Sequence, residues 1–222
     1  MKGKLIVFEG IDGSGKSTQY KRICEKLAAD NITFSHIVFP RYHEESSALI
    51  RMYLGGEFGK NPGDVNAYTA STFYAVDRFA SYKSDWGQKY NNGELIFSDR
   101  YTTSNAVHQG SKLSDDELPE FFAWLKDLEF SKMLLPEPDL VIYLDCDIET
   151  SVSRMRRRET ETNTKADIHE KDIAYLERCL HTARIACDYF GWKKIDYVKD
   201  GQERGLEEKN DEIYDLIRTF LG

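Results

Sequence analysis

An eight-residue segment close to the N-terminus constrains the fold more than any other part of the chain. Residues 10–17 read GIDGSGKS, which matches the phosphate-binding loop G-x-x-x-x-G-K-[ST] at every fixed position. An apolar run at 5–8 precedes the segment, and an amphipathic pattern at 16–29 follows it. Glycine lets successive N–H groups turn inward around an anion, and the N-terminus of the following helix adds positive charge. The segment therefore predicts a phosphate site between a strand and a helix.

The loop predicts binding of a nucleoside triphosphate. Its expected binding residues are Gly10, Asp12, Gly13, Ser14, Gly15, Lys16, Ser17 and Thr18. Lys16 is expected to reach the β- and γ-phosphates, and the Ser17 hydroxyl is expected to bind Mg²⁺. The alternative is a glycine-rich turn that only resembles the motif. It fits less well, because the strand and the helix that the motif requires are both indicated.

The rest of the chain alternates short apolar runs with longer amphipathic segments. Strands are predicted at 5–8, 34–39, 94–98 and 139–144, with a weaker fifth at 195–198. Helices are predicted at 16–29, 66–91, 115–133, 149–158, 169–190 and 207–220. Strands separated by helix-length connections favour a parallel sheet covered on both faces. The pattern predicts a single α/β domain over residues 1–222, a size that one core can stabilise.

Charge and composition argue against several classes of protein. The chain has 38 acidic and 30 basic residues, a net charge of −8, so a general nucleic-acid-binding surface is not expected. No apolar run approaches the roughly 20 residues that a membrane-spanning helix needs. The four cysteines are scattered and lack metal-ligand spacing, which favours reduced thiols. We expect a soluble cytoplasmic protein with no membrane or nucleic-acid partner.

The phosphate loop alone does not distinguish a GTPase, an ATPase and a kinase. A GTPase would carry N-K-x-D at the end of a strand, whereas the fourth predicted strand is followed by DCD at 145–147. Arginines stand instead at widely separated places along the chain, namely Arg41, Arg78, Arg100 and the run at 154–158. In an acidic chain these cations indicate a second anionic ligand opposite the first. Two facing phosphate-bearing ligands are the arrangement of phosphoryl transfer.

Several separate motifs, in order along nearly the whole chain, resemble the thymidylate kinase family. They are the loop FEGIDGSGKST at 8–18, FPRY at 39–42, YAVDR at 74–78, DRYTTSN at 99–105 and the arginines at 154–158. The resemblance implies a three-layer P-loop kinase fold, in which helices flank a five-stranded parallel sheet and a short arginine-rich lid spans about 154–167. It also implies ATP- and Mg²⁺-dependent phosphorylation of dTMP to dTDP, a step in dTTP biosynthesis.

The resemblance also implies the roles of the acceptor-side residues. Arg41 would bind the monophosphate, and Arg100 would contact it from the end of the third strand. Tyr74 would stack on thymine, Arg78 would bond its carbonyl edge, and Ser104 with Asn105 would take the remaining edge. Asp12 would face the sugar hydroxyl or the metal, and Asp99 would bind Mg²⁺ directly or through water. Ordinary packing stays an alternative for Tyr74, a solvent-facing side chain on a loop for Arg41, and loop ordering for the Asp99–Arg100 pair.

The lid supplies the remaining cations in this interpretation. Some members of the family carry arginine at the position of Gly13, and those with glycine rely on lid arginines. Because the residue here is glycine, we expect the lid to provide the catalytic cation, with Arg156 and Arg158 favoured over Arg157 and with Arg154 contacting the donor nucleotide. A solvated helix face is the alternative for such a charge run.

Three residues depart from the family pattern. Tyr74 stands where phenylalanine is usual, and His108 and His169 stand where tyrosines commonly crowd the substrate sugar. Two interpretations stay open. The histidines pack in the same shape without changing selectivity, which we favour, or they weaken discrimination between dTMP and ribonucleotides.

The sequence leaves two other classes of function open. The chain could be a kinase for another nucleoside monophosphate or for several, or a nucleotide-binding regulator without transfer activity. Retention of Lys16, Ser17, Asp99 and the lid arginines argues against the regulator. Homodimerisation is implied by the resemblance alone. An apolar face on the helix at 66–91 is compatible with it, and burial of that face against the chain's own core fits equally well.

Overall fold

The fold is seen in a computed structural model that describes residues 2–162, 173–199 and 202–222. The side chain of Arg158 and all of His169 lie outside this description. None of the described helices is both long enough and apolar enough to cross a membrane.

A five-stranded sheet forms the middle layer, as the sequence predicted. Its strands are β1 (Leu5–Glu9), β2 (Phe34–Val38), β3 (Leu95–Asp99), β4 (Leu140–Asp145) and β5 (Lys193–Asp196). They are parallel and run in the order β2-β3-β1-β4-β5. The chain leaves β1 toward β2 on one side and later returns to β4 on the other. The carboxyl end of β1 is therefore the switch point where ligands of such sheets bind.

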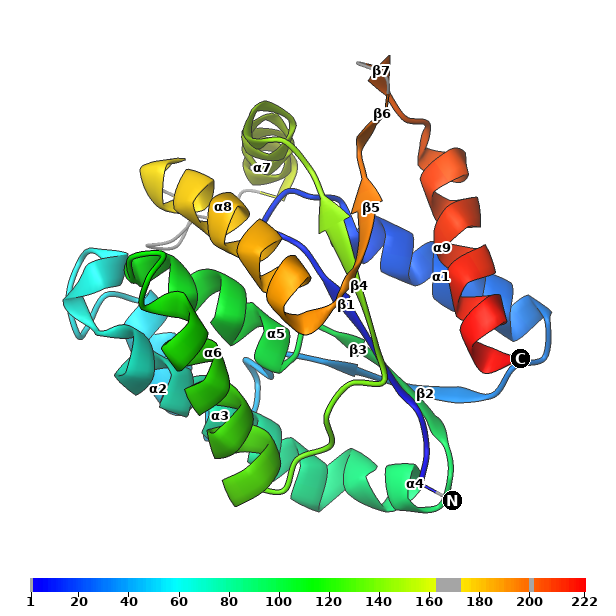
Figure 1. The fold of residues 1–222 in the computed structure, drawn as a ribbon, viewed down its shortest axis with the longest axis horizontal. Coiled ribbons are helices and arrows are strands. Elements are labelled where there is room, and N and C mark those ends of the chain that lie inside the picture. The colour runs from blue at the N-terminus through cyan, green and yellow to red at the C-terminus, as the bar shows by residue number, and fades with distance from the viewer. Residues whose placement is uncertain (1, 163–172, 200–201) are drawn as a thin grey trace.

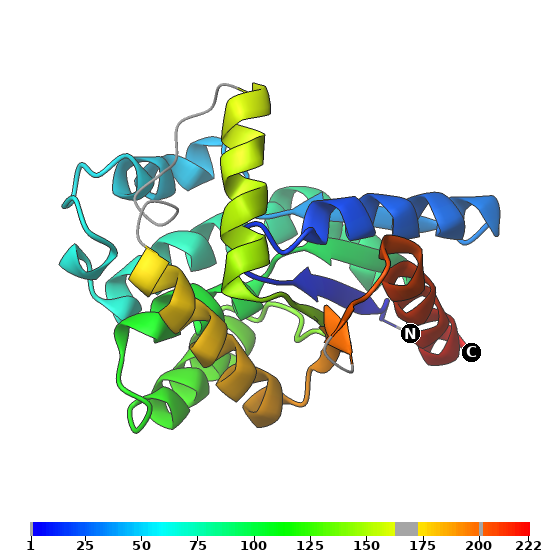
Figure 2. The ribbon, with the colours of Figure 1, turned by 90° about the horizontal axis from the view of Figure 1, so that it is seen from above.

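Helices cover both faces of the sheet (Figure 1). One face carries α1 (Lys16–Ala29) and α9 (Leu206–Leu221). The other carries, in chain order, α2 (Ala48–Leu54), α3 (Ala67–Ser81), α4 (Gly87–Asn91), α5 (Thr102–Ser104), α6 (Leu118–Lys126) and α8 (Ile173–Phe190). The remaining helix, α7 (Ile148–Thr162), rises from the carboxyl edge of the sheet (Figure 2).

Strand β1 shows why this arrangement is stable. Its side chains are fully buried and alternate between the two faces. Ile6 and Phe8 pack with α1 and α9, whereas Leu5 and Val7 pack with the aromatic cluster around Trp86. Burial on both faces explains the continuous apolar run that the sequence shows, because a strand with two covered faces has no side for polar residues.

The structure corrects several predicted boundaries. The fifth strand is 193–196 rather than 195–198, and residues 198–199 pair instead with 202–203 in a two-stranded hairpin, β6 (Val198–Lys199) with β7 (Gln202–Glu203). Helix α2 and the short turns at 45–47 and 62–64 were not predicted. Elements this short are set by the tertiary contacts around them, because they are too short to show a reliable periodicity.

The long helix predicted at 66–91 is present as one continuous helical run. It consists of α3, a π-helical turn (η3, Tyr82–Trp86) and α4. The segment predicted at 115–133 is helical from Leu118, as α6 followed by a second π-helical turn, η6 (Asp127–Lys132). A third π-helical turn, η4 (Asn105–Gln109), directly follows α5. Such turns shift the side chains that follow them and often occur at functional sites.

Candidate active site at the carboxyl edge of the sheet

The phosphate-binding loop joins β1 to α1 as predicted. Gly13 and Gly15 have φ values of 76° and 78°, a region that L side chains rarely adopt. A Cβ atom at Gly13 would also lie 2.2 Å from the carbonyl oxygen of Ser151 on α7. The Ser151 hydroxyl donates to the Asp12 carbonyl oxygen, so α7 closes over the loop from one side. The structure thus gives a steric reason for the glycine at position 13.

The loop lines a cavity of about 680 Å³ that we call the donor cavity. It is lined by residues 11–18 of the loop, by Arg100, by Arg154, Met155 and Arg157 of α7, and by Tyr197, Glu203, Arg204, Leu206 and Lys209. The predicted loop residues from Asp12 to Thr18 are all among them, and Gly10 is the one predicted loop residue outside the lining. A Cβ atom at Gly10 would lie 2.6 Å from the Ser14 hydroxyl oxygen, so this glycine keeps the loop compact.

Arg154 is held against the loop by several contacts. One guanidinium nitrogen donates to the Ser14 carbonyl oxygen at 3.4 Å, and another lies 3.2 Å from the Glu203 carboxylate. The guanidinium also lies 5.1 Å from the ring centre of Tyr197, whose ring is 3.8 Å from the Lys209 amine. Two cations on one aromatic ring fix the shape of this wall of the cavity.

Lys16 pairs with Asp99, the last residue of the adjacent strand β3. The two side chains are only 8% and 13% exposed. Burial lowers the pKa of the Lys16 amine from its ordinary value, the charge of Arg100 lowers it further, and Asp99 opposes both. An incoming phosphate would supply a second anionic partner for this buried cation.

The residues predicted to bind Mg²⁺ offer the kind of ligand that this ion takes. Ser17 is exposed in the first turn of α1, and Asp99 is at the end of β3. A hydroxyl and a carboxylate are hard oxygen donors, and Mg²⁺ bound with a nucleotide usually keeps several waters besides one or two protein ligands. Among the described residues, no cluster of three or more His, Cys, Asp or Glu side chains forms a metal cage.

Arg100 joins the loop to the second half of the site. Its guanidinium lies 3.1 Å from Glu9 and 2.5 Å from Asp12, and its backbone φ is 66°. Burial alone would lower the pKa of this guanidinium, but the carboxylates of Asp12 and Glu9 outweigh it and raise the pKa. The side chain therefore stays charged at the boundary between the donor cavity and a second cavity, both of which it lines.

The second cavity, which we call the acceptor cavity, has a volume of about 300 Å³. The predicted residues that line it are Asp12, Tyr74, Arg78, Arg100, Ser104, Asn105 and His108. The other lining residues are Phe39, Pro40, Tyr42, Leu54, Tyr101 and Gln109. Residues from four separate motifs of the sequence thus meet around one cavity. Asp12 and Arg100 border both cavities, so ligands in the two would face each other across these side chains.

Arg41 stands apart from this group and does not line the acceptor cavity. Its backbone N–H donates to the Asp77 carboxylate at 2.9 Å, and its Nε lies 3.5 Å from the same group. The Ser46 hydroxyl accepts from Arg41 at 3.2 Å and donates to Asp77 at 2.6 Å. Asp77 is almost completely buried and was missed by the sequence analysis, although it precedes Arg78 directly.

His108 is 7% exposed and contacts both charged and neutral partners. Its Nε2 lies 3.1 Å from the Arg100 guanidinium, and its Nδ1 lies 3.6 Å from the Cys179 thiol. Burial raises the pKa of that thiol to about 12. The imidazole therefore lies between a charged guanidinium and a neutral thiol.

The lid is described only in part. Arg154 and Arg157 line the donor cavity and Arg156 does not, although Arg156 and Arg157 are both exposed. Of the predicted lid at 154–167, residues 163–167 lie outside the described part of the chain. The sequence analysis favoured Arg156 over Arg157. Arg157 follows Arg154 by three residues, which places both on one side of a helix, and this spacing could have favoured Arg157 instead.

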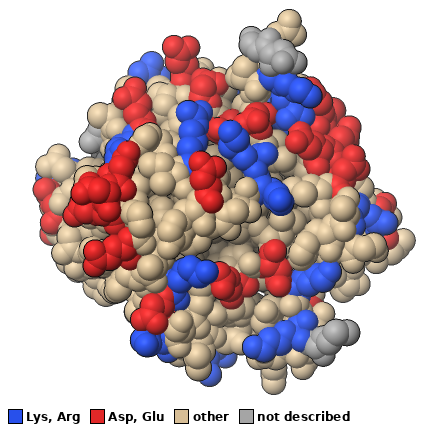
Figure 3. Space-filling model, in the orientation of Figure 1, with Lys and Arg blue, Asp and Glu red and all other residues tan. Residues whose placement is uncertain are grey.

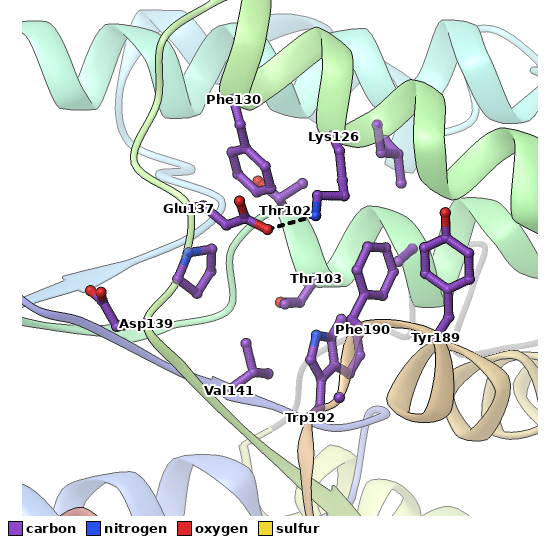
Figure 4. Close-up of a pocket in the computed structure, with 14 residues that line it drawn as sticks. Thr102, Thr103, Lys126, Phe130, Glu137, Asp139, Val141, Tyr189, Phe190 and Trp192 are labelled. Carbon is purple, nitrogen blue, oxygen red and sulfur yellow. Dashed lines mark ion pairs between the residues drawn. The ribbon is translucent and has the colours of Figure 1, made fainter. Parts of the chain in front are cut away.

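A third cavity, of about 390 Å³, borders the same helix α5 as the acceptor cavity. Thr102 and Thr103 line the third cavity (Figure 4), whereas Ser104 lines the acceptor cavity. Aromatic side chains from η6 and from the end of α8 line it, and Lys126 and Glu137 pair across it at 2.9 Å. None of the predicted site residues is part of its lining. On the face of the molecule that Figure 3 shows, basic and acidic side chains are interspersed rather than gathered by sign.

Comparisons with known proteins agree on one family. The family model described as thymidylate kinase matches residues 8–187. A thymidylate kinase of Prochlorococcus marinus is 28% identical over 224 residues, which cover 99% of this chain and 100% of that protein. One from Mycobacterium tuberculosis is 29% identical over 176 residues, 78% of this chain and 81% of that protein. The solved structure of the Candida albicans thymidylate kinase, for which broad substrate specificity is reported, has a similar fold. Its TM-score is 0.70 at 20% identity, covering 98% of this chain and 92% of that one.

Proposed function

The chain belongs to the thymidylate kinase family and is a phosphotransferase that phosphorylates dTMP, and we propose that its donor is ATP·Mg²⁺ and that the two adjoining cavities carry the transfer. The observation that supports this assignment of sites best is the shared border of the two cavities. Asp12 and Arg100 line both, so a triphosphate on the loop would face a monophosphate across a single pair of side chains.

On the donor side, the triphosphate lies on the loop from Gly10 to Thr18, with Arg154 against the nucleotide. Lys16 neutralises the transferring phosphoryl group, exchanging part of its pairing with Asp99 for phosphate oxygens. Ser17 and Asp99 hold Mg²⁺, which when bound neutralises charge on the phosphate oxygens. The loop N–H groups fix the position of the γ-phosphate before transfer, so little reorganisation is needed during it.

On the acceptor side, dTMP lies in the cavity bordered by Tyr74, Arg78 and Asn105. Arg41 and Arg100 bind its phosphate, and an oxygen of that phosphate attacks the γ-phosphorus of ATP in line. The bond from the γ-phosphorus to the bridging oxygen breaks, and ADP leaves with that oxygen. The nucleophile is already an anion, so the reaction needs no strong base, and catalysis consists of positioning and charge neutralisation.

The lid and the sugar side of the acceptor cavity have proposed residues of their own. Arg156 and Arg158 are the lid cations that the sequence analysis favours, and Arg157 joins them because it lines the donor cavity. Asp12 and Ser104 border the sugar side of the acceptor cavity together with His108. His169 is proposed to contact the sugar on the resemblance alone.

The experiment that tests this function is ADP release with ATP·Mg²⁺ and a panel of monophosphates: dTMP, dUMP, UMP, dCMP, dGMP and AMP. We expect the highest kcat/KM with dTMP and a lower value with dUMP. If kcat/KM is highest with another nucleotide, the result supports the alternative of a kinase for other monophosphates. If no monophosphate in the panel leads to ADP release, the chain is the nucleotide-binding regulator without transfer activity.

The same panel separates the two interpretations of His108 and His169. If the histidines weaken sugar discrimination, kcat/KM for dTMP exceeds that for UMP by far less than about 10⁴-fold, the scale of strong hydroxyl discrimination. A ratio at or above that value shows that the histidines preserve selectivity, which is the outcome we expect.

Two further features are proposed for the molecule as a whole. We propose that the chain forms a homodimer, since α3 presents partly exposed Tyr68, Val76 and Phe79 along one stripe. We also propose that it acts in the cytoplasm. The absence of disulfides among its four cysteines, Cys24, Cys146, Cys179 and Cys187, supports that location.

A further inference from the structure

Glu129 lies at the centre of the hydrogen bonds behind the acceptor cavity, although it does not line that cavity. Its carboxylate is fully buried on η6 and accepts from Arg78 through both oxygens, at 2.6 Å to Nε and 2.6 Å to Nη2. It also accepts from the Thr102 hydroxyl at 2.8 Å and from the Asn105 amide at 3.3 Å. Four donors occupy the two oxygens, so the carboxylate has little capacity for further bonds.

The contact with Asn105 decides which way its amide faces. Asn105 Nδ2 donates to the Ser71 carbonyl oxygen at 3.1 Å and to Glu129. Both partners can only accept, so a reversed amide would place its oxygen against two acceptors. The Asn105 side-chain oxygen is then the atom left for a ligand, and within the described residues it accepts no hydrogen bond. Asn105 thus offers the acceptor cavity a hydrogen-bond acceptor.

The contact with Arg78 decides which donors remain beside that acceptor. Three of the five N–H groups of Arg78 are used, two by Glu129 and one by the Tyr101 carbonyl oxygen at 3.3 Å. The two others, on Nη1 and Nη2, are left for a ligand in the cavity that Arg78 lines. The cavity therefore presents N–H donors next to one oxygen acceptor.

This combination matches one class of pyrimidine. Thymine and uracil present the N3–H donor beside carbonyl oxygens, which pair with the Asn105 oxygen and the Arg78 donors. Cytosine has a hydrogen-bond acceptor at N3 and donors on its amino group. Its N3 would face the Asn105 oxygen, also an acceptor, and its amino group would face the Arg78 N–H donors, so neither contact could form a hydrogen bond. We propose that Glu129 is a positioning residue that makes the acceptor site select thymine and uracil over cytosine, a role that rests on the proposed function of this cavity.

The test is the ratio of kcat/KM for dTMP to kcat/KM for dCMP in Glu129→Gln. The new amide group places a donor against Arg78 or Asn105 and lets the Asn105 amide reverse. We expect the ratio to fall at least about tenfold, as for a buried polar group left without its partner. The KM for ATP should stay close to that of the unmodified enzyme, because Glu129 lies outside the donor cavity.

Asp145→Asn is the matched control. Asp145 is also a buried carboxylate that pairs with an arginine, Arg184, but it lines none of the three cavities. We expect this variant to lose stability and to keep the dTMP:dCMP ratio. If Glu129→Gln lowers kcat/KM equally for dTMP and dCMP, as the loss of a merely structural residue would, the proposal is wrong.

Thr102→Val keeps the test decisive if Glu129→Gln does not fold. This nearly isosteric change removes one of the four donors to Glu129 on the side of the third cavity (Figure 4). We expect a fall of about threefold in the ratio, and an unchanged ratio would overturn the proposal. Calorimetric binding of dTMP and dCMP gives the same ratio without turnover. An enzyme that binds dTMP but does not phosphorylate it would refute the proposed function without touching the role of Glu129.

Discussion

At the scale of single residues, Lys16 is the cation on which transfer depends most. It is buried beside Asp99 and is the one loop side chain that carries a positive charge. We expect Lys16→Met to lower kcat by about 10² or more, the effect of removing one preorganised group that stabilises transition-state charge. Steady-state ADP release measures this. Lys21→Met, on the same helix with a side chain 79% exposed, is the control. Near-normal turnover in Lys16→Met would contradict the assignment.

Gly13 tests the steric argument for the loop. Its positive φ and the 2.2 Å from an added Cβ to the Ser151 oxygen both oppose any side chain there. We expect Gly13→Ala to lower the free energy of unfolding by about 1–3 kcal/mol and to raise the KM for ATP. Urea unfolding and kinetics measure the two effects. Gly63→Ala is the control, because no atom lies within 4 Å of its added Cβ. Equal effects in both variants would show that the loop tolerates a side chain.

At the scale of elements, Lys112 ties the turn after η4 to α2. Its amine donates to the Tyr53 hydroxyl at 2.9 Å and to the Val65 carbonyl oxygen at 2.8 Å. Burial lowers the pKa of this amine from 10.5 to about 7. Between these pH values the unfolded chain binds the proton and the folded chain does not, so the free energy of unfolding rises with pH.

Lys112→Met removes this pH dependence. We expect the free energy of unfolding of the unmodified protein, relative to that of the variant, to increase as pH rises from about 7 toward 10.5. Urea unfolding at several pH values measures the difference, and Lys21→Met serves as an exposed control. A difference that stays constant with pH would show that the Lys112 amine is not buried as described.

Helix α7 supplies a prediction about the lid. Arg157 follows Arg154 by three residues and lines the donor cavity with it, whereas Arg156 does not line that cavity. We expect Arg157→Ala to lower kcat more than Arg156→Ala, which would revise the preference drawn from sequence. Single-turnover kinetics with ATP and dTMP compare the two. The opposite order would show that α7 rotates, or that the lid rearranges, when the substrates bind.

At the scale of the whole molecule, the proposed dimer predicts the effect of a charge on α3. Val76 is 47% exposed in the middle of the apolar stripe. We expect Val76→Glu to convert a dimer of twice the 25.7 kDa chain mass into a monomer, since a buried unpaired charge is costly at an interface. Light scattering measures the mass. Leu134→Glu, at an apolar residue 72% exposed, should stay dimeric, and a monomeric unmodified chain would refute the proposal.

The amino-acid sequence by itself determined the architecture and most members of the site. The loop at 10–17 and the five apolar runs are local patterns, and each reports on its own element through glycine chemistry or periodicity. Parallel strands bring their carboxyl ends to one edge, so the residues predicted just after those ends, such as Asp12 and Arg100, do meet around one cavity. Helix α2 and the short turns were not predicted, and the fifth strand was placed two residues too late, because these elements carry too few residues to show a reliable period.

The tertiary structure alone decided how these side chains are held. Glu129 is 51 positions from Arg78, and Asp99 is 83 positions from Lys16. No local pattern distinguishes Glu129 from the exposed carboxylates of an acidic chain. Its role arises because folding removes water from around Arg78. A buried guanidinium is stable only when it is paired, and the fold brings the Glu129 carboxylate beside it. The sequence identifies the side chains that can take part in the chemistry, whereas burial in the folded protein determines which partners orient them.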